Sequence, residues 1–373
     1  MRAKKKKICM LLPNSLDYDT RVLNEAYALA KSYDLTILVP NDSKVKLGEI
    51  PFKVKKVNFW RSKINLFRLA SIIIVLAKIA LKEDPDVFHG HDLPGLLAAW
   101  PAAVLKKKTL IYDSHELWSD LPNFNNIRGL KWFFPLAEKL AMANVSKGIT
   151  VNQSIAEHLT KQYGKEFLSL RNVPSILDRQ KNKFSLRKQF PGDTIVLHLG
   201  STGQWRGAEE LITAAKYLPA GYVIVFVGAG RQEKKLSQMI DMLKLDQKVF
   251  LIPKVPPEEV LNTAAEADLG VTLTQKVSLS YYYSLPNKLF QYIGAQIPIL
   301  GSNFPEFKRI ITREKIGEVV DPSKPKDIAK KIIQIAEAKN QVFYRENLKG
   351  LAKQKYCWQI ESKKLLKFYQ ELE

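Results

Sequence analysis

The sequence predicts two doubly wound α/β domains, each with a parallel β-sheet covered by helices, that face each other across a cleft. Three observations predict this fold class. The chain has 373 residues, enough for two domains of ordinary size. Apolar residue types make up 46% of it and charged types 25%, as in globular proteins with a buried core. Short apolar runs alternate with segments of helical period along its whole length, which is typical of βαβ units.

The first domain is expected at residues 1–172. Residues 21–32 carry an apolar stripe at helical spacing between the first two apolar runs. This strand, helix, strand order predicts parallel strands that are buried on both faces. Strands are expected at residues 8–12, 35–39, 52–57, 87–89, 110–112, 148–151 and 167–170.

The second domain is expected at residues 191–355, after a linker at residues 173–190 where Asn172-Val173-Pro174 interrupts the pattern. Residues 356–373 have a helical period and are expected to pack back onto the first domain. Ligands of such sheets bind beyond the carboxyl ends of the strands, which places the expected site in the cleft. Strands are expected at residues 194–199, 223–227, 249–252, 269–273, 297–300 and 317–319, with helices beginning at Gly207, Gln232 and Asn287.

The charge balance predicts an acidic partner. Lys and Arg number 58 against 37 for Asp and Glu, which gives a formal net charge of +21. A phosphorylated small molecule, an anionic membrane surface and a nucleic acid all fit this excess. The charge is dispersed and no nucleic-acid reader motif occurs, so we expect no nucleic-acid partner.

Cysteine use and the N-terminal segment favour a cytoplasmic protein. Cys9 and Cys357 are far apart in the sequence, which fits a reducing compartment. The apolar run at residues 8–12 is too short for the core of a signal peptide.

Residues 50–82 stand out because they contain basic side chains and no acidic ones. The apolar stretch at residues 66–81 is interrupted by Arg68 and Lys78 and is too short to span a bilayer. Aromatic residues such as Trp60 interleave with the charges, as in helices that lie in a headgroup layer. A peripheral position on the inner face of a membrane is therefore one interpretation. The other is a helix packed on the sheet with a solvated basic face.

Two glycine turns in the second domain indicate an anion site. Gly200 and Ser201 follow the expected strand 194–199, and Arg206-Gly207 precedes a helix. Backbone N–H groups at such a turn approach an anion, and the arginine fork fits phosphate oxygens. Gly228 and its neighbours repeat this arrangement, more weakly, after the next strand. The alternative is a tight turn without a ligand.

Lys288 is a second candidate cation. Pro286 and Asn287 are expected to form a turn and a helix N-cap, which would place Lys288 in the first helical turn. A lysine is disfavoured there by the helix dipole unless an anion compensates it. The alternative is an ordinary surface lysine.

The first domain contributes polar side chains after its strands. Asn14, Asp19 and Arg21 follow the first strand and are expected to point into the cleft. The remaining polar groups are His91, Asp92, His115 and Glu116, which follow two later strands. These four could form a metal site, but hydrogen-bonded structure is the commoner role of such a cluster, and we predict no metal.

In their order and spacing these motifs resemble the retaining glycosyltransferases of family 4, which have the two-domain B-type fold (GT-B). The resemblance covers nearly the whole chain, and residues 285–292, from Leu285 through Asn287, Lys288 and Leu289 to Gln291 and Tyr292, are its most specific block. The other matching motifs are Asp19-Thr20-Arg21-Val22, His89-Gly90-His91-Asp92, Tyr112-Asp113-Ser114-His115-Glu116, Asn172-Val173-Pro174, Arg206-Gly207, Val227-Gly228-Ala229-Gly230 and Ala267-Asp268.

The resemblance implies that the second domain binds a nucleotide-linked sugar and that the first receives the acceptor. Arg206 and Lys288 would hold the donor diphosphate in place of a metal ion, and His115 would meet the transferred sugar near its reacting face. Gly200 matches the turn near the phosphates, although Ser201 replaces the arginine that often follows it in the family. Gly228, Asn287 and Leu289 match further donor-binding positions.

The main departure from the family pattern is the Glu-x7-Glu motif. Gln291 stands where the second carboxylate holds the ribose, and Tyr283 stands where the first faces the sugar. The Gln291 amide can still bond a hydroxyl group, whereas Tyr283 cannot supply negative charge. The identity of the sugar, and less strongly the activity, are open on these grounds.

These features together predict a metal-independent, retaining hexosyltransferase without a cofactor. It would move a sugar from a UDP- or GDP-linked donor to a saccharide or lipid-linked acceptor, in surface glycan or glycolipid biosynthesis for the cell envelope. Two alternatives remain at this point: a non-catalytic sugar-nucleotide-binding partner of a transferase complex, and a sugar-nucleotide epimerase on the same fold.

Overall fold

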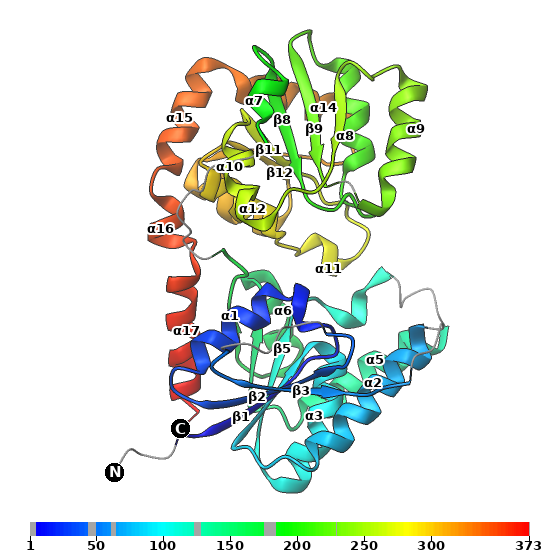
Figure 1. The fold of residues 1–373 in the computed structure, drawn as a ribbon, viewed down its shortest axis with the longest axis vertical. Coiled ribbons are helices and arrows are strands. Elements are labelled where there is room, and N and C mark those ends of the chain that lie inside the picture. The colour runs from blue at the N-terminus through cyan, green and yellow to red at the C-terminus, as the bar shows by residue number, and fades with distance from the viewer. Residues whose placement is uncertain are drawn as a thin grey trace. The chain divides into compact units, whose positions relative to one another are not determined.

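The computed structural model describes residues 5–43, 50–60, 65–122, 128–174, 184–228 and 230–372 (Figure 1). The chain forms two compact units. Unit 1 comprises Met1–Asn172 and Glu361–Glu373, and unit 2 comprises Val173–Ile360. Half of the predicted linker, residues 175–183, lies outside the described residues.

Unit 1 is built on a seven-stranded parallel sheet in the order β3-β2-β1-β4-β5-β6-β7. The central strands β1, β4 and β5 are rich in apolar residues and are buried almost throughout, as expected for a parallel sheet covered on both faces. The edge strand β3 is the exception, because its three lysines are exposed. Each of the seven strands expected in the first half of the chain is present. Their bounds are β1 Lys7–Leu11, β2 Asp34–Pro40, β3 Lys53–Val57, β4 Val87–His91, β5 Thr109–Ser114, β6 Lys147–Thr150 and β7 Phe167–Ser169.

Helices cover the sheet of unit 1. Helices α2, α3 and α5 pack next to one another, α2 against α3 and α3 against α5 (Figure 1). The last helix, α17, starts in unit 2 and belongs to unit 1 from Glu361 onward. The helices are α1 Thr20–Leu29, α2 Asn65–Ala80, α3 Asp92–Lys106, α5 Arg128–Met142, α6 Gln153–Tyr163 and α17 Trp358–Gln370.

Unit 2 contains a six-stranded parallel sheet in the order β10-β9-β8-β11-β12-β13. All six strands expected here are present, which confirms the doubly wound class. The strands are β8 Thr194–Leu199, β9 Tyr222–Val227, β10 Val249–Ile252, β11 Leu269–Thr272, β12 Ile299–Ser302 and β13 Gly317–Val320. The described α-helices of four or more residues are α7 Leu186–Gln189, α8 Ala208–Ala214, α9 Glu233–Leu243, α10 Val260–Ala265, α11 Leu279–Tyr282, α12 Asn287–Ala295, α14 Pro325–Ala336, α15 Ala338–Leu348 and α16 Leu351–Lys355, and a π-helix spans Lys308–Thr312.

Tyr292 anchors α12 to the sheet of unit 2. Its hydroxyl lies 3.1 Å from the carbonyl oxygen of Leu197 and 3.0 Å from that of Val271, and it accepts from the backbone N–H of Leu199 at 3.0 Å. The ring lies against Gly270, where an added Cβ would come within 2.4 Å of it. Any larger residue at position 270 would push α12 away, so this glycine sets the position of the helix that carries Lys288.

Among the described residues, no helix combines the length and the apolar character that crossing a bilayer requires.

Candidate active site

Two glycine turns lie side by side at the carboxyl ends of β8 and β9 in unit 2. Gly200 and Gly228 both have positive φ, 74° and 88°, a conformation that side chains with a Cβ rarely adopt. The Gly200 N–H donates to the carbonyl of Val227 at 2.8 Å, and an ideal Cβ on Gly228 would lie 3.7 Å from the Cα of Gly200. The structure therefore brings together the two turns that the sequence singled out separately.

Arg206 is held by a tight backbone turn. Trp205 and Gly207 on either side have φ of 64° and 74°, and a Cβ at Gly207 would come within 2.4 Å of Leu273. The guanidinium lies over the ring of Tyr281, 5.2 Å from its centroid. Backbone and ring thus fix the direction of this cation without using its hydrogen-bond donors.

Lys288 lies in the first turn of α12, as predicted, but its environment differs from both interpretations of the sequence. Its Nζ is 2.9 Å from Nε2 of His198, the fifth residue of β8. Burial, and then the positive charge of Arg206, lower the pKa of Lys288 to about 7. Burial and Lys288 hold the pKa of His198 well below its usual range, so the neutral imidazole accepts the hydrogen bond.

The sequence predicted that Pro286 and Asn287 together form a turn and the N-cap of the helix that became α12, and the structure places this N-cap one residue earlier than Asn287. Pro286 is the N-cap of α12, and Asn287 is its first helical residue. Because Pro286 offers no side-chain oxygen, the first N–H groups of α12 receive no side-chain cap. The Leu289 N–H donates to the Pro286 carbonyl at 3.0 Å, which leaves those of Asn287 and Lys288 available to an anion.

In the described part of the chain, neither Arg206 nor Lys288 has a carboxylate within ion-pair distance. Two cations, two glycine turns and an uncapped helix N-terminus form a group of donors that lacks an acceptor. A diphosphate has the charge and the oxygens to complete it.

The other predicted donor-side residues surround this group. Asn287 and Gln291 are one helical turn apart and therefore share a face of α12. Asn287 and Ser201 are exposed, Gln291 is half-buried and Leu289 is buried. Tyr283 is half-buried beside Tyr282, with 5.5 Å between ring centroids.

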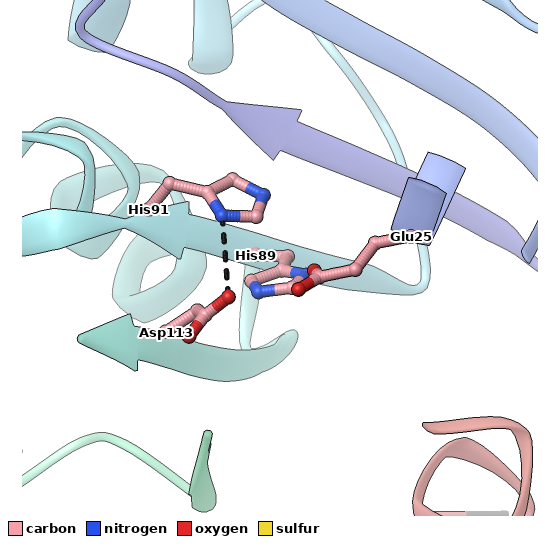
Figure 2. Close-up of side chains that lie close together, drawn as sticks. All are labelled: Glu25, His89, His91 and Asp113. Atoms are coloured by element: carbon pink, nitrogen blue, oxygen red, sulfur yellow. Dashed lines mark ion pairs between the residues drawn. The ribbon is translucent and has the colours of Figure 1, made fainter. Parts of the chain in front are cut away.

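Unit 1 holds a buried polar cluster at the ends of β4 and β5 (Figure 2). His91 of β4 is paired in register with Asp113 of β5, and their side chains approach to 3.5 Å between Nδ1 and Oδ2. His89, two residues earlier, points to the same face of the sheet. Glu25 of α1 reaches the same cluster.

Arg21 of α1 balances the charge of this cluster. It donates to both oxygens of Asp113, at 2.8 Å and 3.1 Å, to the carbonyl of Leu170 at 2.6 Å, and it lies 3.1 Å from Glu25. Burial opposes the charge of Asp113, but Arg21 and His115 hold its pKa well below the usual range. Burial and Asp113 raise the pKa of Glu25 well above its usual range. Asp113 therefore carries the negative charge that Arg21 neutralises.

His115 is the member of this cluster that reaches the surface, with 16% of its side chain exposed. Its Nε2 lies 3.4 Å from Asp113, its Nδ1 lies 3.7 Å from Asp92, and its backbone N–H donates to Asp92. Burial lowers the pKa of His115, but these two carboxylates outweigh it and raise the pKa to about 10. His115 is thus an imidazolium at neutral pH. Because the 3.7 Å from Nδ1 to Asp92 is longer than a hydrogen bond, the Nδ1–H is the ring donor that can bond a ligand.

Several acceptor-side expectations are corrected by burial. Arg21 and His91 have 3% and 0% of their surface exposed and bind other residues of unit 1, so they cannot meet an acceptor directly. Asp19 caps α1, its side chain accepting from the Val22 N–H at 3.1 Å. Asn14 and Glu116 are exposed.

The residues grouped as metal-ligand candidates differ from the predicted set. Within the described ranges, Glu25, His89, His91 and Asp113 offer ligand atoms that all lie within 4.8 Å of one another, whereas Glu116 lies outside this group (Figure 2). Arg21 already pairs with both of its carboxylates. A guanidinium therefore provides the positive charge that a metal ion would bring.

Two features of the site were missed by the sequence interpretation. His198 lies at the end of the expected strand 194–199, just before the glycine turn, and a histidine at this place carries no signal that it will bond a lysine 90 residues away. Tyr369 of α17 bonds His89 across 280 residues, and its spacing in the sequence indicated only a helix.

The fold and site define a protein with two Rossmann-like units, of which the second presents cations for an anionic ligand. The family described as "Glycosyltransferase Family 4" matches residues 19–169, and that described as "Glycosyl transferases group 1" matches residues 178–355. The chain belongs to the family 4 glycosyltransferases of group 1, and its fold is GT-B.

Solved structures show the same fold over nearly the whole chain. HepE of Anabaena, solved in complex with UDP-glucose, is 17% identical, with a TM-score of 0.77 over 98% of this chain and 100% of that one. A glycosyltransferase from Rickettsia africae is 14% identical, with a TM-score of 0.76 over 98% of both chains. WaaG, a glycosyltransferase involved in lipopolysaccharide biosynthesis, is 15% identical, with a TM-score of 0.70 over 96% of this chain and 98% of that one.

A curated relative is the chitobiosyldiphosphodolichol beta-mannosyltransferase of Candida albicans, which is 23% identical over 254 residues. The match covers 62% of this chain but only 55% of that relative, so the chain spans about half of its length.

Proposed function

We propose that the protein is a retaining glycosyltransferase that moves a sugar from a UDP- or GDP-linked donor to a saccharide or lipid-linked acceptor, in surface glycan or glycolipid biosynthesis. The observation that carries the proposal is the pair Arg206 and Lys288, two cations without a carboxylate partner in the described chain, beside two glycine turns. HepE, with the same fold, binds UDP-glucose, which supports a nucleotide-linked donor in unit 2.

In this mechanism the protein acts mainly by electrostatics. As the bond from the sugar to the diphosphate breaks, negative charge grows on the leaving phosphate, and Arg206 and Lys288 stabilise it together with backbone N–H groups. The leaving phosphate can accept the proton of the acceptor hydroxyl on the same face of the sugar, so the anomeric configuration is retained. The two cations supply the charge that a metal ion supplies elsewhere, and chelators should leave activity unchanged.

His115 acts as a hydrogen-bond donor in this proposal. With its pKa raised to about 10, it keeps its proton at neutral pH and cannot serve as a general base. Its partly exposed ring can instead bond a hydroxyl of the transferred sugar. Asp19 caps α1 through one carboxylate oxygen and is the remaining candidate to orient the acceptor hydroxyl.

The test is a titration of UDP, GDP and their sugar conjugates, with and without chelator, in the parent and in Arg206→Ala and Lys288→Ala. Each substitution should weaken binding of the preferred nucleotide by about tenfold or more. Lys326→Ala is the matched control, because Lys326 lies over the ring of Tyr217 and its loss removes the same charge from unit 2. Binding that is equal in all four proteins would show that the phosphate site is misplaced.

Transfer itself separates the proposal from its alternatives. A transferase releases free nucleotide only as its acceptor gains a sugar, and the anomer of the product reports retention. A non-catalytic partner binds the donor without turnover, which the replacement of carboxylates by Tyr283 and Gln291 would explain. An epimerase alters the sugar without any acceptor.

We further propose that unit 1 works at the inner face of an anionic membrane. In α2, Phe67 and Ile74 are about half exposed, and Arg68 and Lys78 lie on the same helix. Helix α5 adds Trp132, Phe133, Leu136 and Leu140, which the sequence interpretation overlooked. Within the described residues of α2 and α5 no acidic side chain is exposed, which suits anionic headgroups. Arg61 and Lys63, part of the predicted basic segment, lie outside the described residues.

Vesicle sedimentation tests this surface. The parent should bind vesicles that contain an anionic lipid and should lose binding as salt rises. Trp132→Ser combined with Phe67→Ser should weaken binding several-fold, whereas Val342→Ser, which removes an exposed apolar residue of α15, should not. Equal binding by neutral and anionic vesicles would exclude charge recognition.

A further inference from the structure

Three imidazole rings form a row inside unit 1 that ends at His115. The rings of His89 and His91 are stacked, with centroids 4.2 Å apart and planes at 29°. Those of His91 and His115 meet at 67°, with centroids 5.5 Å apart, and Nδ1 of His91 lies 3.4 Å from Nε2 of His115. His89 and His91 are fully buried, and only the last ring of the row is partly exposed.

The C-terminal helix holds the inner end of this row. The hydroxyl of Tyr369 in α17 lies 2.7 Å from Nδ1 of His89. Both side chains are buried, and burial raises the pKa of Tyr369 while it lowers that of His89, so both are neutral. The phenol O–H therefore donates to Nδ1, which leaves the ring proton of His89 on Nε2.

Asp113 holds the outer end. Its Oδ2 lies 3.5 Å from Nδ1 of His91 and 3.4 Å from Nε2 of His115, so one carboxylate oxygen faces both rings. Arg21 fixes this carboxylate with two hydrogen bonds (Figure 2 shows Asp113 beside His91). Rings fixed at both ends cannot turn independently, and a shift of His89 must be taken up by His91 and then by His115.

We propose that Tyr369 and His89 are positioning residues for His115, and that the C-terminal helix thereby sets the orientation of the side chain that meets the transferred sugar. The role of His115 in transfer rests on the proposed function, whereas the coupling itself belongs to unit 1 alone. The usual role of a terminal helix would be to cover the sheet. Here it also supplies a buried hydroxyl whose only described hydrogen bond is to the row.

The kinetic test uses Tyr369→Phe and His89→Phe, which keep the ring volume and remove the hydrogen bond from either side. Each should lower kcat by roughly 2- to 10-fold, the range that one buried hydrogen bond spans, and leave KM for the donor unchanged. The double variant should be no slower than the slower single one, since both remove the same bond. Tyr344→Phe is the control, because it removes a tyrosine hydroxyl that bonds Glu318 in unit 2.

A spectroscopic test does not require activity. The chain has five histidines, so ¹⁵N-histidine spectra give five pairs of ring-nitrogen signals that single substitutions assign. In Tyr369→Phe we expect the signals of His89, His91 and His115 to move together, while those of His158 and His198 stay. If only His89 moves and kcat is unchanged, the proposal is overturned. If the rings move together in a protein that transfers no sugar, the proposed function fails and the coupling stands.

Discussion

The buried cluster of unit 1 and the cation pair of unit 2 hold their charges in opposite ways. In unit 1, Arg21 and His115 face Asp113 and Asp92, so positive and negative groups satisfy each other inside the protein. In unit 2, Lys288 has a neutral imidazole and Arg206 a tyrosine ring as its nearest described partner. The first arrangement is balanced in charge, although Nε2 of His89 and Nε2 of His91 have no hydrogen-bond partner among the described residues. The second lacks an anion and gains most when one binds.

This contrast explains why the pKa values of the two basic side chains His115 and Lys288 shift in opposite directions. The two carboxylates beside His115 raise its pKa to about 10, whereas the lack of any such partner lets burial and Arg206 lower the pKa of Lys288 to about 7. Lys288 loses its proton easily in the free protein, so a bound anion would stabilise its protonated form. The contrast therefore supports the proposed division, in which unit 1 orients a ligand and unit 2 binds the donor phosphates.

The largest expected effect on stability comes from removing Arg21 from the buried cluster of unit 1. Arg21→Met leaves Asp113 and Glu25 buried without their cation, and we expect the free energy of unfolding to fall by about 3–5 kcal/mol. Denaturant unfolding measures the loss. Arg68→Met is the control, since its pair with Asp42 is exposed and should contribute less than about 1 kcal/mol. Equal losses in the two variants would mean that the cluster is not charge-balanced by Arg21.

The next effect concerns the turn that aims Arg206. In Gly207→Ala the new Cβ would come within 2.4 Å of Leu273 at a φ of 74°, and overpacking plus backbone strain should cost about 1–3 kcal/mol. Gly221→Ala separates the two causes, because Gly221 has a φ of 80° and nothing within 4 Å of its Cβ position. Thermal unfolding should show a smaller loss for Gly221→Ala. If the losses match, strain alone explains both and the close packing at Leu273 contributes nothing.

Most strands of this fold could be predicted from sequence because they are short runs of apolar or β-branched residues that local composition reveals, whereas β3 has three lysines beside its two valines. The site was only partly predictable. Lys288 and Arg206 lie next to Pro286 and Gly207, which mark their turns in the sequence. The pairings of Arg21 with Asp113 and of His198 with Lys288 depend on which strands become neighbours. That depends on the order of strands in the sheet, and no local pattern encodes it.

The third prediction is that nucleotide affinity depends on pH through Lys288 of unit 2. Below pH 7 Lys288 is already protonated, and nucleotide affinity does not depend on its titration. Above its pKa of about 7 the free protein loses the proton that the complex requires, so affinity should fall by about tenfold between pH 7 and pH 8.5. Calorimetric titration with UDP or GDP in buffers of different ionisation enthalpy also measures the proton taken up.

Lys288→Arg is the matched control for this pH dependence. An arginine keeps its charge throughout the range, so the affinity of this variant should stay level above pH 7. A level affinity in the parent as well would place the titration of Lys288 outside the working range, and the contrast with His115 would then fail.

The smallest expected effect tests how Arg206 is aimed. The ring of Tyr281 lies beneath the guanidinium at 5.2 Å, and its replacement in Tyr281→Leu should weaken donor binding by about 0.5–1 kcal/mol, or two- to five-fold. Tyr217→Leu removes the ring below Lys326 in the same unit and should leave donor binding unchanged. A loss as large as that of Arg206→Ala would mean that the ring, rather than the turn at Gly207, sets the direction of the cation. Unchanged donor binding in Tyr281→Leu would mean that the backbone turn at Gly207 alone sets the direction of Arg206. Unit 2 would then orient this cation by backbone geometry, whereas unit 1 holds His115 by its contacts with two carboxylates.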